Sequence, residues 1–307
     1  MKQRPFKQVD VFTATPYFGN PLAVVLDGSG LDDDAMQRFA RWTNLSETTF
    51  LRPPTDASAD YRLRIFTPDG ELPFAGHPTL GSCHSWLPAG GQPKSADFMV
   101  QECGVGLGKI RREAGTQRLA FAAPPLKRSA PSPVVLAKVA AALGLKAPQI
   151  LAAQLLDNGP VWLGLLLDSP QTVLQLTPNH LALEQLEVKV GVAAVYPPEE
   201  APPLIARANR EARAFDSGLK HGITVAPDLE VRAFVAAIGI NEDPVTGSLN
   251  ASLAQWLIAE RHLPERYLAS QGACLGRSGQ VYLERDAQGQ VWVGGESVTC
   301  IDGQVTL

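Results

Sequence analysis

The chain has 307 residues, which is too long for one ordinary core and suits two domains of roughly 150 residues each. Its formal net charge of −4 gives no electrostatic signature of a nucleic-acid or membrane-surface partner. Four scattered cysteines without CxxC spacing argue against a zinc site or a secreted disulfide framework.

The N-terminus lacks the apolar core of a signal peptide. The longest notable apolar run, Val161–Leu167, is far too short to span a bilayer. We therefore expect a soluble, cytoplasmic protein.

The first part of the chain predicts short strands joined by turns, together with a helix over 31–42 that buries Met36, Phe39 and Ala40 on one face. A Pro-rich stretch at 122–133 is the best linker candidate, and a helix over Val134–Leu143 follows it. The predicted strands are 8–12, 20–26, 48–51, 61–66, 98–103, 105–111 and 117–121.

The second part repeats this mixture, with a helix expected over 180–188. Because strands dominate each part around one conspicuous helix, we predict an α+β protein with two pseudo-repeated domains, 1–125 and 126–296. Each is a barrel-like, mostly antiparallel sheet wrapped around a central helix. The predicted strands here are 161–167, 192–196, 204–208, 229–235, 280–284, 290–293 and 298–301.

One stretch occurs twice, first as Glu71-Leu-Pro-Phe-Ala-Gly-His77 and again as Glu242-Asp-Pro-Val-Thr-Gly-Ser248. A strand-like run precedes each copy, and nine or ten helix-compatible residues ending in Trp-Leu follow it. This strand, turn, glycine and helix pattern, recurring about half a chain later, indicates a duplicated domain.

Each copy predicts a helix N-terminus aimed at a ligand. His77 and Ser248 are expected to cap the two helices, and Gly76 and Gly247 would let a ligand approach the backbone. Helix starts present unpaired N–H groups and partial positive charge, which suit a carboxylate or phosphate. The alternative is two ordinary capped helices, which the repetition disfavours.

Glu47 is the strongest acid/base candidate. It could form a capping box with Asn44, but the β-branched and aromatic residues after it, with Pro53 close behind, disfavour a helix there. A carboxylate at the head of a buried strand is costly unless it is paired or functional. His77 can exchange a proton near neutral pH, whereas the carboxylate of Asp243 could merely stabilise a helix start.

The histidines and cysteines show no ligand spacing to one another, so no metal site is expected.

With these residues in hand, the chain resembles the PhzF-like family of phenazine-biosynthesis isomerases, which share the diaminopimelate-epimerase-like fold. The resemblance covers nearly the whole chain. It is carried by Val9–Thr13, Phe18–Leu26, Asn44–Phe50, Phe66–Pro68, Glu71–Leu80, Glu242–Ser248 and Gln271–Gly279.

The resemblance implies a cofactor-independent isomerase or epimerase that moves a proton on a small carboxylate-bearing substrate in a cleft between twin domains. By this resemblance Glu47 is the acid/base, and His77, Asp243 and Ser248 are its polar partners. Gly76, Gly247 and Asn20 would bind the substrate. It also implies a homodimer, and a last strand at about 297–307 that completes the first domain.

Related epimerases and proline racemases carry a thiol just before each of the two glycines. Ala75 and Thr246 stand there in this chain, so a one-base reaction is expected. The alternative function is a catalytically inactive small-acid-binding or protein-interaction relative with the same fold.

Overall fold

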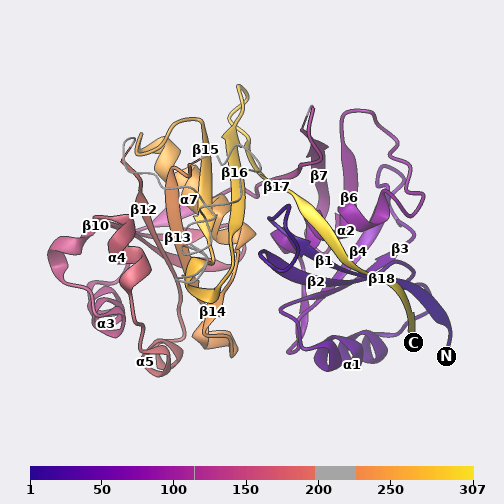
Figure 1. Cartoon of the computed structure of the whole chain (residues 1–307), viewed down its shortest axis with the longest axis horizontal. Coiled ribbons are helices and arrows are strands. Elements are labelled where there is room, and N and C mark those ends of the chain that lie inside the picture. Colours follow the sequence, from indigo (N-terminus) through magenta and orange to yellow (C-terminus); the bar gives the residue numbers. More distant parts are fainter. Residues whose placement is uncertain (114, 198–225) are drawn as a thin grey trace, which may run out of the picture. The chain divides into compact units, whose positions relative to one another are not determined.

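The chain divides into two units, which are described separately (Figure 1). Unit 1 comprises Met1–Ala122 and Val293–Leu307, and unit 2 comprises Ala123–Trp292. The computed structural model describes residues 1–113, 115–197 and 226–307. The strand predicted at 204–208 lies outside the described residues.

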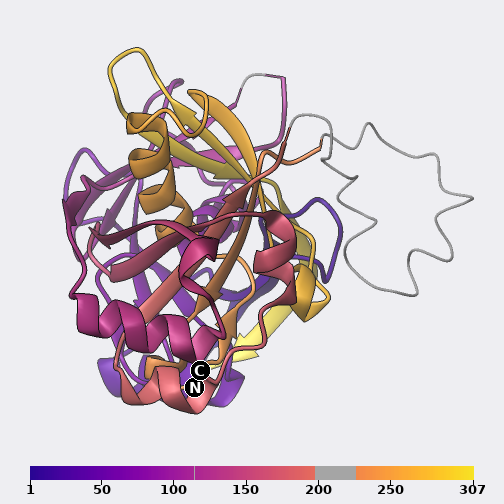
Figure 2. The ribbon, with the colours of Figure 1, turned by 90° about the vertical axis from the view of Figure 1, so that its left-hand side faces the viewer.

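Unit 1 is a mostly antiparallel sheet. The final strand β18 (Ser297–Thr306) pairs with β1 (Gln3–Val11), which brings both chain ends together (Figure 2). Two pairs are parallel, β2 with β3 and β4 with β6. The other strands are β2 (Asn20–Val25), β3 (Thr48–Arg52), β4 (Tyr61–Phe66), β5 (Glu71–Leu72), β6 (Met99–Cys103), β7 (Gly106–Arg112) and β8 (Leu119–Ala122).

Helix α2 (Gly76–Trp86) is the central helix of unit 1, with nine of its eleven residues buried. Its small residues allow strands to pass close by. A Cβ atom added at Gly81 would lie within 2.9 Å of side chains on β1 and β2. Helix α1 (Asp33–Thr43) covers a separate core with Met36, Phe39 and Ala40, as the sequence predicted.

Unit 2 repeats the strand pairing of unit 1. The consecutive pairings from β1–β2 to β6–β7 in unit 1 have the same directions as those from β10–β11 to β15–β16 in unit 2. The strands are β9 (Lys127–Ser129), β10 (Ile150–Asp157), β11 (Val161–Leu167), β12 (Lys189–Val195), β13 (Leu229–Phe234), β14 (Glu242–Asp243), β15 (Arg266–Gln271), β16 (Gly279–Arg285) and β17 (Val291–Gly295), the last crossing the unit boundary.

Helix α7 (Gly247–Ala259) is the central helix of unit 2, with ten of thirteen residues buried. Here the strands carry the glycines. A Cβ at Gly191 on β12 would lie 2.2 Å from Leu249, and one at Gly164 on β11 would lie 3.3 Å from Trp256.

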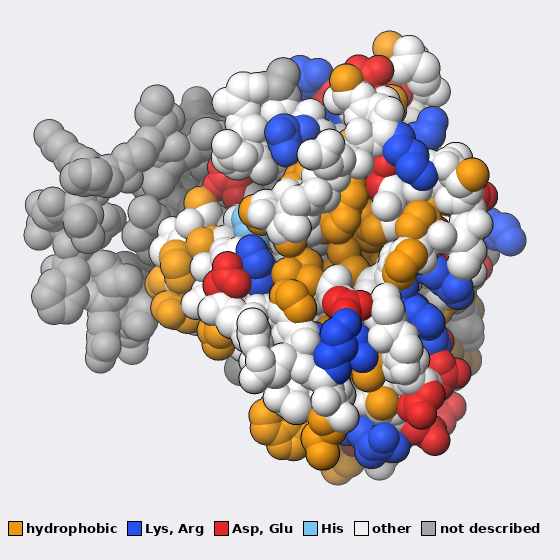
Figure 3. Space-filling model, turned by 90° about the vertical axis from the view of Figure 1, so that its right-hand side faces the viewer, with side chains coloured by type: hydrophobic (Ala, Val, Ile, Leu, Met, Phe, Trp, Pro, Cys, Tyr) orange, Lys and Arg blue, Asp and Glu red, His pale blue; other side chains and the backbone are white. Residues whose placement is uncertain are grey.

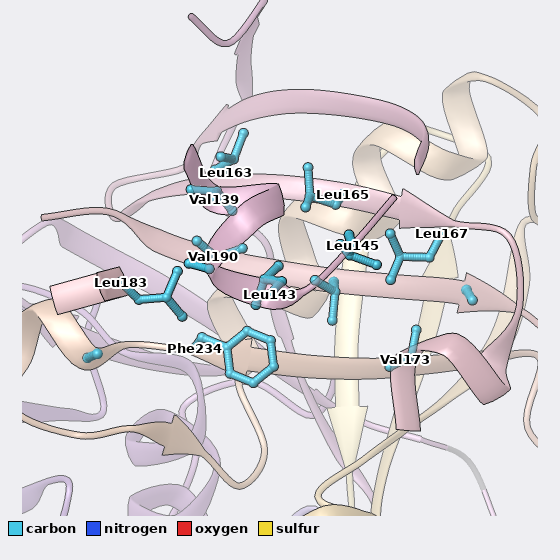
Figure 4. Packing of buried hydrophobic residues seen from close by; sticks show 14 residues of the cluster. Val139, Leu143, Leu145, Leu163, Leu165, Leu167, Val173, Leu183, Val190 and Phe234 are labelled. Carbon is cyan, nitrogen blue, oxygen red and sulfur yellow. The ribbon is translucent and has the colours of Figure 1, made fainter. Parts of the chain in front are cut away.

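The other face of the unit 2 sheet packs against three short helices, α3 (Pro133–Leu143), α4 (Pro170–Gln175) and α5 (His180–Gln185) (Figure 4). Alternate residues of β11 point into this core, because successive strand residues face opposite sides. Phe234 closes the core from β13.

The duplicated strand, turn and helix unit predicted from sequence is confirmed. In each unit a two-residue strand, β5 or β14, pairs with the strand before it and leads into the central helix. The predicted helix caps were wrong: Ala75 and Thr246 are the N-cap residues, so His77 and Ser248 are the second helical residues. Pro78 is third, where its missing N–H still costs no intrahelical bond.

No helix within residues 1–113, 115–197 and 226–307 is long and apolar enough to cross a membrane. On the face shown in Figure 3, basic and acidic side chains are interspersed among hydrophobic ones.

Candidate active site

Glu47 lies at the head of β3, with 15% of its side chain exposed. Helix α1 ends just before it, because Asn44 adopts the left-handed conformation (φ 53°) and its N–H bonds the Ala40 carbonyl. The capping-box alternative is therefore wrong, since Asn44 ends a helix rather than beginning one. Thr48 and Thr49 are fully buried, so β3 holds the carboxylate at the edge of the core.

The imidazole of His77 faces this carboxylate. Its Nε2 atom lies 3.4 Å from Glu47 Oε2, somewhat longer than a good hydrogen bond, as is common for catalytic pairs without substrate. Burial lowers the pKa of His77 to about 3. The ring is therefore neutral at pH 7, and the predicted part of His77 in proton exchange stays a prediction.

Asn20 lies against the other ring nitrogen of His77. Its side chain is fully buried, and its Nδ2 atom lies 3.4 Å from His77 Nδ1. With the amide nitrogen of Asn20 toward the ring, Nδ1 accepts and the neutral ring carries its proton on Nε2, toward Glu47. His77 is thus arranged as a hydrogen-bond donor to the carboxylate.

The turn before β2 fixes Asn20. The Gly19 N–H donates to Asp10 Oδ2 at 2.9 Å, and a Cβ atom at Gly19 would lie 2.2 Å from the Val11 carbonyl oxygen. Only glycine fits this approach. The family resemblance predicts that Asn20 contacts substrate. The structure places its amide against His77, and the substrate contact stays a prediction.

The N-terminus of α2 begins at this cluster. Thr79 N–H makes the first intrahelical bond, to Ala75 O, so the N–H groups of Gly76 and His77 have no partner within the helix. Such groups favour an anion. Glu47, His77, Asn20 and the start of α2 together form what we call the unit 1 cluster.

In unit 2, Asp243 lies three residues before the N-cap Thr246. The Thr246 hydroxyl donates to Asp243 Oδ2 at 2.6 Å, and Gln271 at the end of β15 contacts both residues. Thr246 and Gln271 were missed as site residues, although Gln271 begins one of the motifs that carry the family resemblance. Leu249 of α7 packs against Gly191 on β12.

Ser248 is held by two groups from the β10–β11 hairpin. Trp162 Nε1 donates to its Oγ atom at 3.2 Å, and Asn158 Nδ2 donates to its carbonyl oxygen at 3.0 Å. The hydroxyl proton is thereby left to point elsewhere. Asp243, Thr246, Ser248 and Gly247, the first residue of α7, form the unit 2 cluster.

Each cluster thus presents a helix start beside a carboxylate. Sequence reasoning could not identify Trp162 and Asn158, because they precede Ser248 by more than 80 residues. Within the part of the chain that the structure describes, no group of three or more His, Cys, Asp and Glu side chains could hold a metal ion.

A central helix wrapped by strands in each of two repeated units is the arrangement of the diaminopimelate-epimerase-like fold. The chain belongs to the phenazine biosynthesis-like (PhzC-PhzF) family, whose model matches residues 9–303.

Two curated relatives cover nearly all of the chain. Antisense-enhancing sequence 1 of Schizosaccharomyces pombe is 34% identical, over 99% of this chain and 99% of its own. The trans-2,3-dihydro-3-hydroxyanthranilate isomerase of Pseudomonas aeruginosa is 32% identical, over 97% of this chain and 98% of its own.

Solved structures show the same fold. A PhzF-family protein of Bacillus anthracis matches with a TM-score of 0.78 at 22% identity and covers 100% of both chains. A probable proline racemase of Agrobacterium radiobacter matches with a TM-score of 0.61 at 12% identity, over 99% of this chain and 93% of its own.

Proposed function

We propose that the protein is a cofactor-independent isomerase in which the Glu47 carboxylate removes a proton from one carbon of a small acid and returns it to another carbon. The observation that carries the proposal is the pairing of Glu47, at the head of a buried strand, with the neutral, buried ring of His77. A neutral donor at Nε2 orients the carboxylate without adding a second group that titrates near pH 7.

The residues at the two positions where related epimerases carry thiols support a one-base reaction. The residues before Gly76 and Gly247 are Ala75 and Thr246, and both are N-caps of the central helices. Alanine has no group that titrates, and the proton of Thr246 is donated to Asp243. Glu47 is then the group that takes up and returns the proton.

The substrate class follows from the helix starts. First-turn N–H groups favour an anion, and preorganised donors of this kind stabilise charge that develops in a transition state. We therefore propose a small carboxylate-bearing substrate. The isomerase from P. aeruginosa, whose name gives a cyclic hydroxy acid as substrate, makes such acids the first to be tested.

A panel of cyclic and amino acids, incubated with the protein in deuterated water and followed by mass spectrometry, tests the proposal. We expect at least one member to gain deuterium at carbon during turnover. A panel that binds without any exchange would favour the other candidate, a small-acid-binding relative without turnover.

We further propose that the protein forms a homodimer, as the resemblance implies. Light scattering coupled to size-exclusion chromatography checks this, with a dimer mass expected, and a monomer mass at micromolar concentration contradicting it.

A further inference from the structure

The amide of Gln271 is saturated with hydrogen bonds. Its side chain is fully buried. Its Nε2 atom donates to Asp243 O at 3.0 Å and to Thr246 Oγ1 at 2.9 Å. Its Oε1 atom accepts from Thr246 N at 3.0 Å and from Asn250 Nδ2 at 2.9 Å.

Only one orientation of this amide is possible. The backbone N–H of Thr246 can only donate, and the Asn250 Nδ2 atom is also a donor, with its other hydrogen on the Thr246 carbonyl. Exchanging the oxygen and nitrogen of Gln271 would therefore oppose donors to donors. The nitrogen must face the Thr246 hydroxyl.

This orientation directs the Thr246 proton. Because Thr246 Oγ1 accepts from Gln271, its single hydrogen is free to donate to Asp243 Oδ2, at a distance of 2.6 Å. The hydroxyl makes no capping bond to its own helix, although Thr246 is the N-cap of α7. Its hydrogen bonds thus serve Asp243 rather than the helix start.

We propose that Thr246, oriented by Gln271, is a positioning residue that holds the Asp243 carboxylate as an anion in one fixed orientation. The inference deepens the proposed function and rests on it for the role of Asp243 in substrate contact. It also gives Thr246 a task distinct from that of the racemase-type thiol at the same position, because its proton goes to a neighbouring carboxylate and not to substrate carbon.

Other charged groups near β14 have partners of their own. Arg232 on β13 forms a two-bond ion pair with Glu242, and Tyr196 donates to Glu230 on the same strand. Two more groups, Cys274 and Arg277, follow β15. All of these groups are unchanged in the experiment below, so a shift in the titration of Asp243 reports the loss of the Thr246 hydroxyl.

The test is the titration of the Asp243 carboxyl, followed by ¹³C NMR of protein labelled at aspartate, with Asp243→Asn assigning the signal. In Thr246→Val, which keeps the volume and branching, we expect the titration midpoint to rise by about one pH unit, because a hydrogen bond to the charged form is lost. Thr246→Ser retains the hydroxyl and should restore the midpoint.

The matched control is Ser252→Ala, which removes another fully buried hydroxyl from α7 and should leave the midpoint unchanged. An unchanged midpoint in Thr246→Val, or in Thr246→Ala should valine not be accommodated, would overturn the inference. The readout needs no turnover, so failure to find an isomerase substrate leaves this result standing, and the two failures are distinguishable.

Discussion

At the scale of single residues, the chemistry available to the Glu47–His77 pair depends on which of the two side chains carries a charge. Burial makes the imidazole neutral, and with the amide nitrogen of Asn20 toward Nδ1 the ring proton lies on the side of the carboxylate. In the proposed function the pair therefore acts as a base with an oriented donor. This arrangement differs from one in which Glu47 and His77 would share a mobile proton.

The neutral state of His77 has a consequence for stability. An unfolded histidine binds a proton below about pH 6.5, whereas folded His77 does so only near pH 3. Between these values the unfolded state holds more protons, so stability falls as pH falls, by up to about 1.4 kcal/mol per unit. We expect urea unfolding between pH 6.5 and 4.5 to show a shallower decline for His77→Asn than for the wild type. Equal slopes would show that folded His77 is protonated in this range.

At the scale of elements, each copy of the repeated stretch has an equivalent ion pair to the strand before it. Arg64 on β4 makes a two-bond ion pair with Glu71 on β5, and Arg232 on β13 does the same with Glu242 on β14. Each guanidinium also lies about 5 Å from the ring two residues on, Phe66 at 5.1 Å or Phe234 at 4.9 Å. Each pair fixes the short strand that leads into a central helix.

The two ion pairs differ in burial, which predicts different effects of the same substitution. In unit 2 both side chains are almost fully buried, at 6% and 5% exposure, whereas Glu71 is 41% exposed. Glu242→Gln should therefore destabilise the protein by about 3–5 kcal/mol, because Arg232 keeps an uncompensated buried charge. Glu71→Gln should cost less than about 1 kcal/mol. Chemical denaturation of both variants checks this, and similar losses would contradict it.

The sequence predicts elements well where local signals agree. Helix α3 begins at Pro133 and ends before Gly144, as its capping residues indicate. Strands β10 and β15 were missed, because their sequences Ile-Leu-Ala-Ala-Gln-Leu-Leu-Asp and Arg-Tyr-Leu-Ala-Ser-Gln contain few β-branched residues and their extended form depends on neighbouring strands. The linker candidate at 122–133 contains β9, which pairs with β10.

The helix starts were misplaced for a related reason. Serine is a good cap and proline suits the first helical residue, so Ser248 and Pro78 favoured later starts. In the structure glycine already takes the first helical position in both copies.

At the scale of the whole molecule, the duplication extends far beyond the two short motifs. Six successive strand pairings repeat in the same order and direction in the two units, although the motifs cover only seven residues each. Pairing geometry persists because it is set by backbone hydrogen bonds and alternating burial, which many sequences satisfy.

The principal residues of the candidate site could be predicted from the sequence, but the hydrogen-bond partners that hold them could not. Glu47 stood out as a carboxylate at the head of a strand. Asn20 precedes His77 by 57 residues and Gln271 follows Thr246 by 25, so their contacts exist only once the sheets have formed. No local pattern indicates such contacts.

The most direct test of the account is the rate of solvent-deuterium incorporation into a turned-over substrate by Glu47→Gln. We expect this rate to fall by about 10²–10⁴-fold while ligand binding is retained, because the amide keeps the shape of the side chain and loses the base. Glu113→Gln, which alters a carboxylate of similar exposure elsewhere in unit 1, should exchange at the wild-type rate. Wild-type exchange by Glu47→Gln would contradict the account.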